Sequence, residues 1–371
     1  MFESNPDFSD NTYPVYVLLK KFLPDYKMVW TTKHYSPNID ALNDADDIVY
    51  IEYQNVFEWL KYLYYCSRCR AMICCNIIPR KLKKSQLLMY LGHGSETKRV
   101  KEMLNINNLQ VDYVNLQSHC FDESSIDNIN CSPDKFVYLG YPRCDYFYKS
   151  DNPEDIEQII TGEKFKFIIW LPTFRGHRSG TRDDAPDSVF NKIGIPLIYS
   201  IESLREFNNF LRDKNIHIIY KPHPAQDLDV VKKETLSNFH LIYDSDILSK
   251  KLQLYQIIAQ SEALITDYSS VFWDYLLLDK PIAVTTDDLA NWSSGRGFVI
   301  DIEAIHDKIA EKVFDSRGLC EFITGLLDGR DPKQQTRREV RDIANIWKDG
   351  NSAMRTVNFI MQKLKERYPD K

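Results

Sequence analysis

The apolar positions of this chain fall into short runs of four to seven residues that alternate with longer segments of helical spacing. Runs that predict strands lie at 27–32, 47–51, 71–77, 86–91, 111–116, 137–139, 165–171, 216–220, 263–265, 281–285 and 295–300. Helical spacing covers 56–66, 201–211, 252–260, 271–278, 319–327, 336–347 and 352–367. This alternation is typical of βα units around mainly parallel sheets, and it predicts an α/β protein.

A polar, acid-rich stretch at 149–162 interrupts this rhythm, which then restarts. We therefore predict two domains, residues 1–150 and 151–350, each a Rossmann-like parallel sheet with helices, facing each other across a cleft. The C-terminal helix, residues 352–371, can pack back on the first domain. A second polar stretch, 176–186, is expected to be a mobile loop.

The composition is that of an ordinary globular enzyme, with 43% hydrophobic and 27% charged residues among 371. No window contains the roughly 18 uncharged apolar residues of a membrane-spanning helix, and the polar start has no secretory core, so we expect a cytoplasmic protein. The net charge of −6 argues against nucleic acid as a partner. The sequence does not indicate an oligomeric state.

Eight cysteines raise the question of a metal site. Cys66 and Cys69 have the spacing of half a zinc site, but no second pair matches it. Cys74 and Cys75 are neighbours in a predicted strand and should point to opposite faces. We predict reduced thiols and no metal site. No motif requires a cofactor, although a divalent cation remains compatible with the sequence.

Polar residues follow several predicted strands at their carboxyl ends, the edge where open α/β sheets build ligand sites. His93 lies between Gly92 and Gly94 after the strand 86–91. In the second half, the corresponding candidates are Thr173, Arg175, Lys221 and His223.

The segment 263–278 predicts a strand, a polar turn and a helix. The turn contains Thr266, Asp267, Ser269 and Ser270. The first turn of a helix presents unpaired N–H groups and a partial positive charge, both of which suit phosphate oxygens. Alternatively, the two serines are only helix caps.

Together these groups suit a diphosphate with a neutral substituent, because they combine cationic side chains, a helix start and two imidazoles that can exchange protons near neutral pH. The sequence has no Walker loop, no G-x-G-x-x-G after a first strand and no D-x-D pair, which disfavours kinases and dehydrogenases. Each histidine could instead be structural, and Arg143 could simply pin the domain junction.

An ordered set of short motifs spans nearly the whole chain. It comprises Phe2-Glu3-Ser4 with Ser9-Asp10-Asn11, Gly92-His93-Gly94 with Lys98, Gly140-Tyr141-Pro142-Arg143 with Asp145, Pro172-Thr173-Phe174-Arg175, Pro222-His223-Pro224, Thr266-Asp267-Tyr268-Ser269-Ser270 with Asp274, Lys280-Pro281, Arg296-Gly297-Phe298 and Asp349-Gly350-Asn351-Ser352. In this order the motifs resemble the CDP-glycerol glycerophosphotransferases, the polyol-phosphate transferases of teichoic acid and capsule synthesis.

The resemblance implies a GT-B architecture whose first domain binds the acceptor and whose second binds a CDP-activated polyol. It implies that glycerol phosphate or ribitol phosphate passes to a hydroxyl of a glycan or lipid-linked acceptor, with release of CMP. His93 resembles the family's general base and His223 its second essential histidine. The other expected substrate-binding residues are Gly94, Lys98, Arg143, Thr173, Arg175, Lys221, Thr266, Asp267, Ser269, Ser270, Asp274 and Arg296.

Two other functions remain open at this point: a GT-B glycosyltransferase or epimerase that uses a sugar nucleotide, and a non-catalytic acceptor-binding subunit. Contact with a membrane surface is a further possibility. The aromatic segment containing Trp59, Tyr62, Leu63 and Tyr65 precedes the basic residues Arg68, Arg70, Arg80, Lys81, Lys83 and Lys84. Core packing with a solvated basic face would explain the same pattern.

Overall fold

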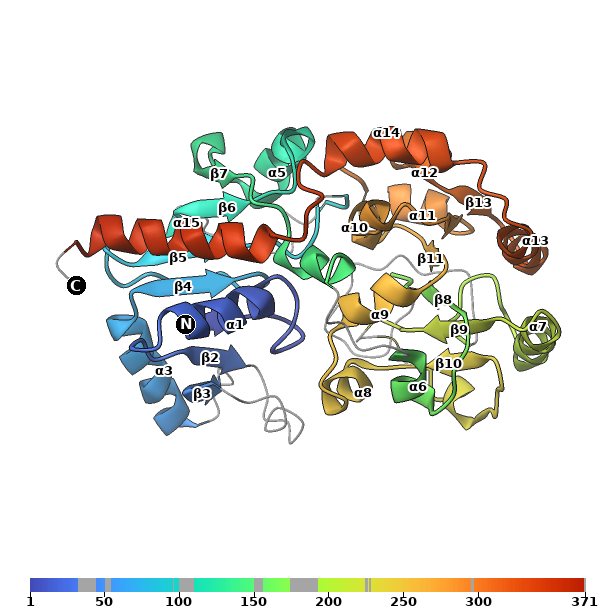
Figure 1. Cartoon of the computed structure of the whole chain (residues 1–371), viewed down its shortest axis with the longest axis horizontal. Helices are drawn as coiled ribbons and strands as arrows, with labels where there is room; N and C mark the ends of the chain where they lie inside the picture. The colour runs from blue at the N-terminus through green and yellow to red at the C-terminus, as the bar shows by residue number, and fades with distance from the viewer. Residues whose placement is uncertain are drawn as a thin grey trace.

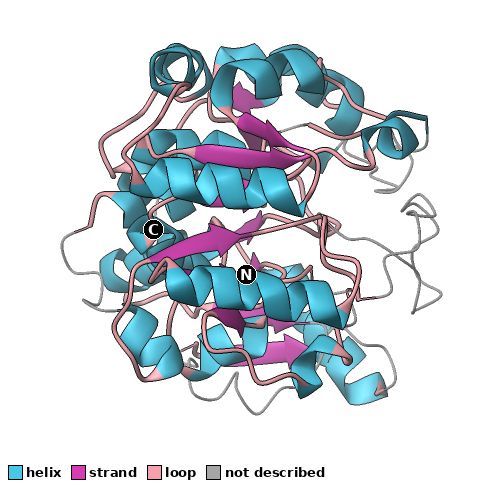
Figure 2. Cartoon of the chain, turned by 90° about the vertical axis from the view of Figure 1, so that its right-hand side faces the viewer, coloured by secondary structure: helices cyan, strands magenta, loops and turns pink. Residues whose placement is uncertain are grey.

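The protein is analysed as a computed structural model that describes residues 1–32, 45–50, 55–95, 97–99, 110–149, 156–173, 193–223, 226, 228–294 and 297–369. Two parallel sheets lie side by side in Figure 1, and Figure 2 shows helices flanking their strands. The predicted loop at 176–186, and with it Arg175 and Arg296, lies outside the described residues. The predicted α/β fold class is confirmed.

The first sheet has seven strands in the order β3-β2-β1-β4-β5-β6-β7. Their bounds are β1 Phe2–Glu3, β2 Val29–Thr32, β3 Asp47–Tyr50, β4 Ala71–Cys74, β5 Leu87–Tyr90, β6 Tyr113–Asn115 and β7 Phe136–Val137. The two residues of β1 lie between β2 and β4, where Phe2 pairs with Trp30 and Ile73. A two-residue strand has no periodicity of its own, which is why the sequence pattern did not indicate it.

Helices cover both faces of this sheet. α1 (Thr12–Phe22) and α15 (Ser352–Arg367) pack on one face, whereas α3 (Val56–Arg68) and α5 (Asp122–Ile129) pack on the other. Cys75 belongs to the first core and Cys74 to the second, as the alternation of strand side chains predicts. All eight cysteines are free thiols.

The second sheet has six strands in the order β10-β9-β8-β11-β12-β13. Their bounds are β8 Phe167–Trp170, β9 His217–Tyr220, β10 Phe239–Leu241, β11 Leu264–Thr266, β12 Ile282–Thr285 and β13 Glu311–Val313. α7 (Ile201–Asp213) and α13 (Ser316–Leu327) cover one face. The other carries α6 (Ile156–Thr161), α8 (Asp244–Ser249), α9 (Leu254–Gln260), α10 (Val271–Tyr275), α12 (Ile302–Ile309) and α14 (Gln334–Ala344), and α11 spans Leu289–Ser294.

The chain crosses between the sheets at two adjoining places. The 3-10 segment η4 (Pro142–Phe147), at the centre of Figure 1, contacts α9 of the second sheet as well as α1 and α15 of the first. Its Asp145 carboxylate accepts hydrogen bonds from the backbone N–H groups of Ser352 and Ala353, at distances of 2.9 and 2.8 Å. Asp145 therefore caps the N-terminus of α15, where the chain returns to the first sheet.

Three local predictions need correction. The segment 149–162, expected to be a linker, contains the helix α6. In the segment expected as a strand at 295–300, the described residues 297–300 form no ladder but only an isolated bridge through Phe298. The helix expected over 271–278 is α-helical only to Tyr275 and continues as a 3-10 turn to Leu278. Among the described residues, no helix is both long and apolar enough to cross a membrane.

Candidate active site

His93 lies in the turn that follows β5, at the edge of the first sheet that meets the second domain. The flanking glycines are required there for separate reasons. Gly92 has φ +76°, a left-handed conformation that side chains rarely adopt. A β-carbon on Gly94 would collide with Oγ of Ser270. The histidine turn of one domain is therefore in direct contact with the strand–turn–helix segment of the other.

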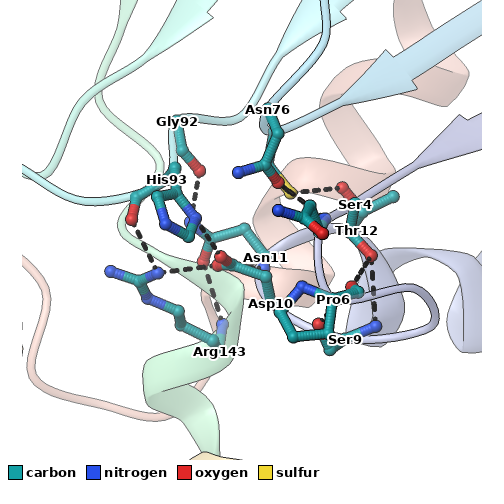
Figure 3. A network of polar contacts seen from close by, with 12 residues as sticks. Ser4, Pro6, Ser9, Asp10, Asn11, Thr12, Asn76, Gly92, His93 and Arg143 are labelled. Atoms are coloured by element: carbon teal, nitrogen blue, oxygen red, sulfur yellow. Dashed lines mark hydrogen bonds and ion pairs between the residues drawn. The ribbon is translucent and has the colours of Figure 1, made fainter. Parts of the chain in front are cut away.

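Asp10 holds the His93 ring from one side (Figure 3). Its Oδ2 lies 2.6 Å from Nδ1 of His93, and the imidazole is 56% exposed whereas the carboxylate is almost fully buried. Burial opposes the charged form, but Arg143 and His93 outweigh it and lower the pKa of Asp10 to about 2. Asp10 is thus ionised at neutral pH and can only accept the hydrogen bond.

The Arg143 guanidinium bridges two carboxylates from different domains. Nη1 donates to Oδ1 of Asp10 at 2.7 Å and to the carbonyl of His93 at 3.0 Å, as Figure 3 shows. Nη2 donates to Oδ2 of Asp274, on α10, at 2.6 Å. Burial disfavours this charge, yet the two carboxylates raise the pKa of Arg143 further, so the group is a buried cation. We refer to Asp10, Arg143 and Asp274 as the interdomain clasp.

Further polar contacts from both domains hold the Asp274 carboxylate in place. Tyr255 donates its hydroxyl hydrogen to Oδ2, and Nε2 of Gln117 donates to Oδ1 at 2.8 Å. Gln117 also donates to Oδ1 of Asn345 at 3.0 Å. Because Gln117 belongs to the first domain, it provides a second link across the same junction.

An isolated backbone bridge joins the domains beside the clasp. Lys98 and Phe298 form an antiparallel bridge, and the N–H of Val299 donates to the carbonyl of Thr97 at 3.1 Å. The Trp273 indole N–H donates to the Thr97 hydroxyl, also at 3.1 Å. Lys98, expected at the substrate, thus lies at the junction beside Gly297 and Phe298, the described part of the motif that begins at Arg296.

In the second domain, the predicted residues gather at the carboxyl ends of β8, β9 and β11. Asp267 accepts from the Thr173 backbone N–H at 2.8 Å and from its hydroxyl at 3.0 Å. Thr266 donates its hydroxyl hydrogen to the carbonyl of Leu171 at 2.7 Å. Asp267 and Thr266 are fully buried, so their contacts brace the turn that presents Ser269 and Ser270.

Lys221 and His223 follow β9 at the same edge of the sheet. Lys221 pairs with Asp244 across 2.9 Å and is buried, whereas His223 is half-buried. The structure therefore brings His93, Gly94, Arg143, Asp274 and Ser270 together. It places Thr173, Asp267, Lys221 and His223 along the adjoining edge of the second sheet. The contacts of all these residues with a substrate remain predictions.

Sequence reasoning did not select Asp10, Tyr255 or Gln117 as site residues. In the sequence, Asp10 stands out only as part of a motif near the N-terminus, more than 80 positions from His93. Its conformation is unusual, since φ is 57° in a residue that is not glycine. Backbone strain of this kind concentrates at functional sites, but a sequence does not reveal it.

His306, on α12, lies behind the strand–turn–helix segment. Its ring stacks near Tyr268 and Phe272, and among the described residues no hydrogen-bond partner reaches Nε2. Burial lowers the pKa of His306 to about 4. Burial and the neighbouring His217 likewise lower the pKa of His240 to about 4.

These two histidines predict a loss of stability in mild acid. An unfolded histidine titrates near 6.5, so below this pH the unfolded chain binds protons that the folded chain does not. The free energy of unfolding should therefore fall from about pH 6.5 down to about pH 4, by up to roughly 1.4 kcal/mol per pH unit for each histidine. Urea titrations between pH 7 and 4.5 measure this slope. His306→Met should reduce this slope by about half, because His240 still contributes, whereas substitution of the exposed His119 should leave it unchanged. An unchanged slope in His306→Met would contradict the assignment.

Two Rossmann-like parallel sheets joined by a crossover and a returning C-terminal helix define the GT-B fold class. Known structures agree with this fold. The wall teichoic acid polymerase TagF superposes with a TM-score of 0.74 at 20% identity, over 99% of this chain and 89% of that one. A UDP-N-acetylglucosamine 2-epimerase superposes with a TM-score of 0.55 at 14% identity, over 100% and 95%. At these identities, the likeness concerns the fold.

The family model described as CDP-Glycerol:Poly(glycerophosphate) glycerophosphotransferase matches residues 1–362, and the chain belongs to that family. It is 27% identical over 229 residues to the teichoic acid glycerol-phosphate primase of Bacillus subtilis, covering 61% of this chain and 51% of the primase. It is 25% identical over 332 residues to the teichoic acid poly(glycerol phosphate) polymerase of the same species, covering 82% and 41%. The chain thus spans about half the length of these two relatives.

Proposed function

We propose that this protein transfers glycerol phosphate or ribitol phosphate from a CDP-activated donor to a hydroxyl group of a glycan or lipid-linked acceptor in the synthesis of teichoic acid or a capsular polymer. Membership of the glycerophosphotransferase family supports this activity. The observation that carries it is the contact between the His93 turn and Ser270, which sets a carboxylate-bound imidazole against a strand–turn–helix segment suited to phosphate.

The proposed reaction is an in-line displacement at the polyol-bearing phosphorus. The acceptor oxygen forms a new bond to this phosphorus while the bond to the bridging oxygen breaks, and CMP leaves with the electron pair. Nε2 of His93 takes the proton of the attacking hydroxyl, since Nδ1 faces Asp10. One polyol phosphate is transferred and one CMP is released in each turnover.

The second domain supplies the groups for the donor diphosphate. Ser269 and Ser270 stand where α10 begins, and His223 follows β9 at the same edge. We assign to them, with Arg175, the stabilisation of charge on the leaving phosphate oxygens. Lys221 is already paired with Asp244, so it contributes mainly by holding this edge of the sheet.

CMP release measured by chromatography tests the proposal, with CDP-glycerol, CDP-ribitol and a UDP-sugar offered alongside candidate acceptors. Mass spectrometry of the products should show addition of a polyol phosphate. Donor binding can be measured separately, because a ligand at 100 times its dissociation constant stabilises the folded state by about 2.7 kcal/mol. Stabilisation or turnover by UDP-sugars alone would favour the glycosyltransferase or epimerase alternative. Binding of acceptor without any turnover would favour a non-catalytic subunit.

We further propose peripheral contact with the inner face of the cell membrane through α3. This helix exposes a group of large apolar side chains: Val56, Phe57, Trp59, Leu60 and Tyr64. They differ partly from the aromatic set expected from the sequence, because Tyr65 donates to Asp47 and Tyr62 packs against the core. Exposed Lys83 and Lys84 lie in the basic segment that leads to β5. Apolar anchors with basic residues favour an anionic lipid surface.

Flotation with vesicles containing anionic lipid tests this contact. The double substitution Phe57→Ser and Leu60→Ser should lower the vesicle-bound fraction about tenfold or more, since a fully buried large apolar side chain contributes roughly 1.5–3 kcal/mol. Reversal of charge at Lys83 and Lys84 should weaken binding in low salt. Phe314→Ser, at an exposed position in the second domain, is the matched control. Equal flotation of all variants would exclude α3 as the contact.

A further inference from the structure

We propose that Asp10 is the positioning residue of His93, and that the interdomain clasp makes this alignment depend on docking of the second domain against the first. The inference rests on the proposed function, in which His93 accepts the proton of the acceptor hydroxyl. Beyond that function, we assign a role to Asp10 and infer that the alignment of His93 depends on the position of the second domain.

The contact with Asp10 determines the tautomer of His93. Asp10 is an ionised acceptor, so the short contact of 2.6 Å requires a hydrogen on Nδ1 of the imidazole. The lone pair then lies on Nε2, the nitrogen that faces away from Asp10. The carboxylate also lies against the imidazolium that forms when Nε2 takes a proton. This is the arrangement by which a buried carboxylate orients a catalytic histidine in other enzymes.

A well-packed loop carries Asp10. Residues 4–11 are tied together internally: Ser4 donates its hydroxyl hydrogen to the carbonyl of Pro6 at 2.7 Å, and the N–H of Ser9 donates to Oγ of Ser4 at 3.2 Å. Phe8 is fully buried and stacks on Trp30 with ring centroids 4.4 Å apart. Figure 3 shows this loop supporting Asp10 beneath the His93 ring. The loop thus holds Asp10 in its left-handed backbone conformation and keeps its carboxylate in place.

The two carboxylate oxygens of Asp10 have different partners. Oδ1 is occupied by Nη1 of Arg143, which leaves Oδ2 for His93. The same guanidinium donates through Nη2 to Asp274 of the second domain and through Nη1 to the carbonyl of His93. One rigid planar group therefore sets the position of Asp10, the backbone of His93 and Asp274 of α10 at once.

His93 is therefore aligned as a general base only when the two domains are docked. When the second domain is docked, Asp274 holds Arg143 in the orientation that presents Asp10 to His93. When Asp274 moves away, the guanidinium loses one of its two carboxylates and the constraint on Asp10 is relaxed. Tyr255 and Gln117 hold Asp274 in place, so they belong to the same unit. Proton transfer is thereby confined to the arrangement in which the donor phosphate is opposite the acceptor.

Steady-state kinetics of CMP release test the positioning role. Asp10→Asn removes the charge and replaces the acceptor with an amide, so kcat should fall about 10- to 10³-fold while KM for the CDP-polyol stays within about threefold. Asp10→Glu restores the carboxylate and should recover at least threefold over Asp10→Asn. Glu321→Gln, which makes the same chemical change in an exposed ion pair on α13, is the control and should match the wild type.

A double-mutant cycle tests the dependence on docking. Asp274→Asn should also lower kcat, and adding it to Asp10→Asn should lower kcat little further, because both act through one unit. Tyr255→Phe, which removes only a hydroxyl from Asp274, provides a milder substitution if Asp274→Asn folds poorly. Multiplicative effects of the two changes would overturn the linkage.

The outcomes also separate this inference from the proposed function. If the wild-type protein releases CMP and Asp10→Asn keeps its kcat, the positioning role is wrong and the function stands. A rise in KM at unchanged kcat, or a loss of kcat that Asp10→Glu does not recover, would likewise assign Asp10 a merely structural or binding role. If the wild type releases no CMP from either CDP-polyol, both proposals fail.

Discussion

Replacement of His93 by glutamine should lower kcat for CMP release by about 10²- to 10⁴-fold, the usual contribution of a general base. Glutamine keeps hydrogen-bonding capacity opposite Asp10 but cannot accept a proton from the acceptor hydroxyl. The imidazole is 56% exposed, so its loss should have little effect on folding. Rapid-quench measurement of CMP at saturating donor and acceptor determines whether the loss lies in the chemical step.

His119→Gln is a matched control, because His119 is also exposed and also lies beside a carboxylate, Asp122, at 3.5 Å. It should retain the wild-type rate. If His93→Gln also retained it, His93 would not be the base, and the proton of the acceptor would have to leave by another route. A loss of rate in both variants to the same extent would point to a nonspecific effect of removing a surface imidazole.

Replacement of Arg143 by methionine should have the largest effect on stability, lowering the free energy of unfolding by about 3–5 kcal/mol. The substitution keeps most of the apolar volume between Tyr141 and Tyr255 but leaves the carboxylates of Asp10 and Asp274 buried without their shared cation. A buried charge deprived of its partner is costly because the protein interior solvates it poorly. Urea unfolding at neutral pH, followed by tryptophan fluorescence, measures the change.

Arg205→Met provides the comparison. Arg205 also forms a paired hydrogen-bonded contact with a carboxylate, Glu234, but this pair lies at the surface. Its removal should leave the urea midpoint nearly unchanged, since the Arg205 guanidinium is exposed to water and such surface ion pairs contribute little. Equal effects of the two substitutions would mean that the clasp is no stronger than a surface ion pair. A milder loss in the double substitution Arg143→Met with Asp274→Asn would confirm that the unpaired Asp274 charge causes part of the effect.

The short motifs of this chain divide into two groups once they are placed in the fold. Those around His93 and Ser270 face each other across the domain junction. Gly140 and Asp145 meet the motif 349–352 at the crossover, where Asp145 caps α15 and a β-carbon on Gly140 would crowd Oγ of Ser352. These residues set how the two domains are joined, whereas Arg143, between them in the chain, reaches the His93 turn.

The sequence alone determined the class of this protein. Regular alternation of apolar runs and helical segments is a local property of the chain, and it predicted two parallel-sheet domains and most of their longer elements. The ordered motifs indicated the family, and the position of His93 after a strand indicated its place at the edge of the sheet. All of these depend on residues that are close together in the chain.

The tertiary structure alone decided the arrangement around His93. The central strand β1 has only two residues, and its place between β2 and β4 comes from pairing with distant segments rather than from its own pattern. Asp10, Arg143 and Asp274 are separated by more than 130 positions at each step and meet only when both domains have folded. Contacts at such distances depend on the packing of whole sheets and helices, which local hydrophobic periodicity does not encode.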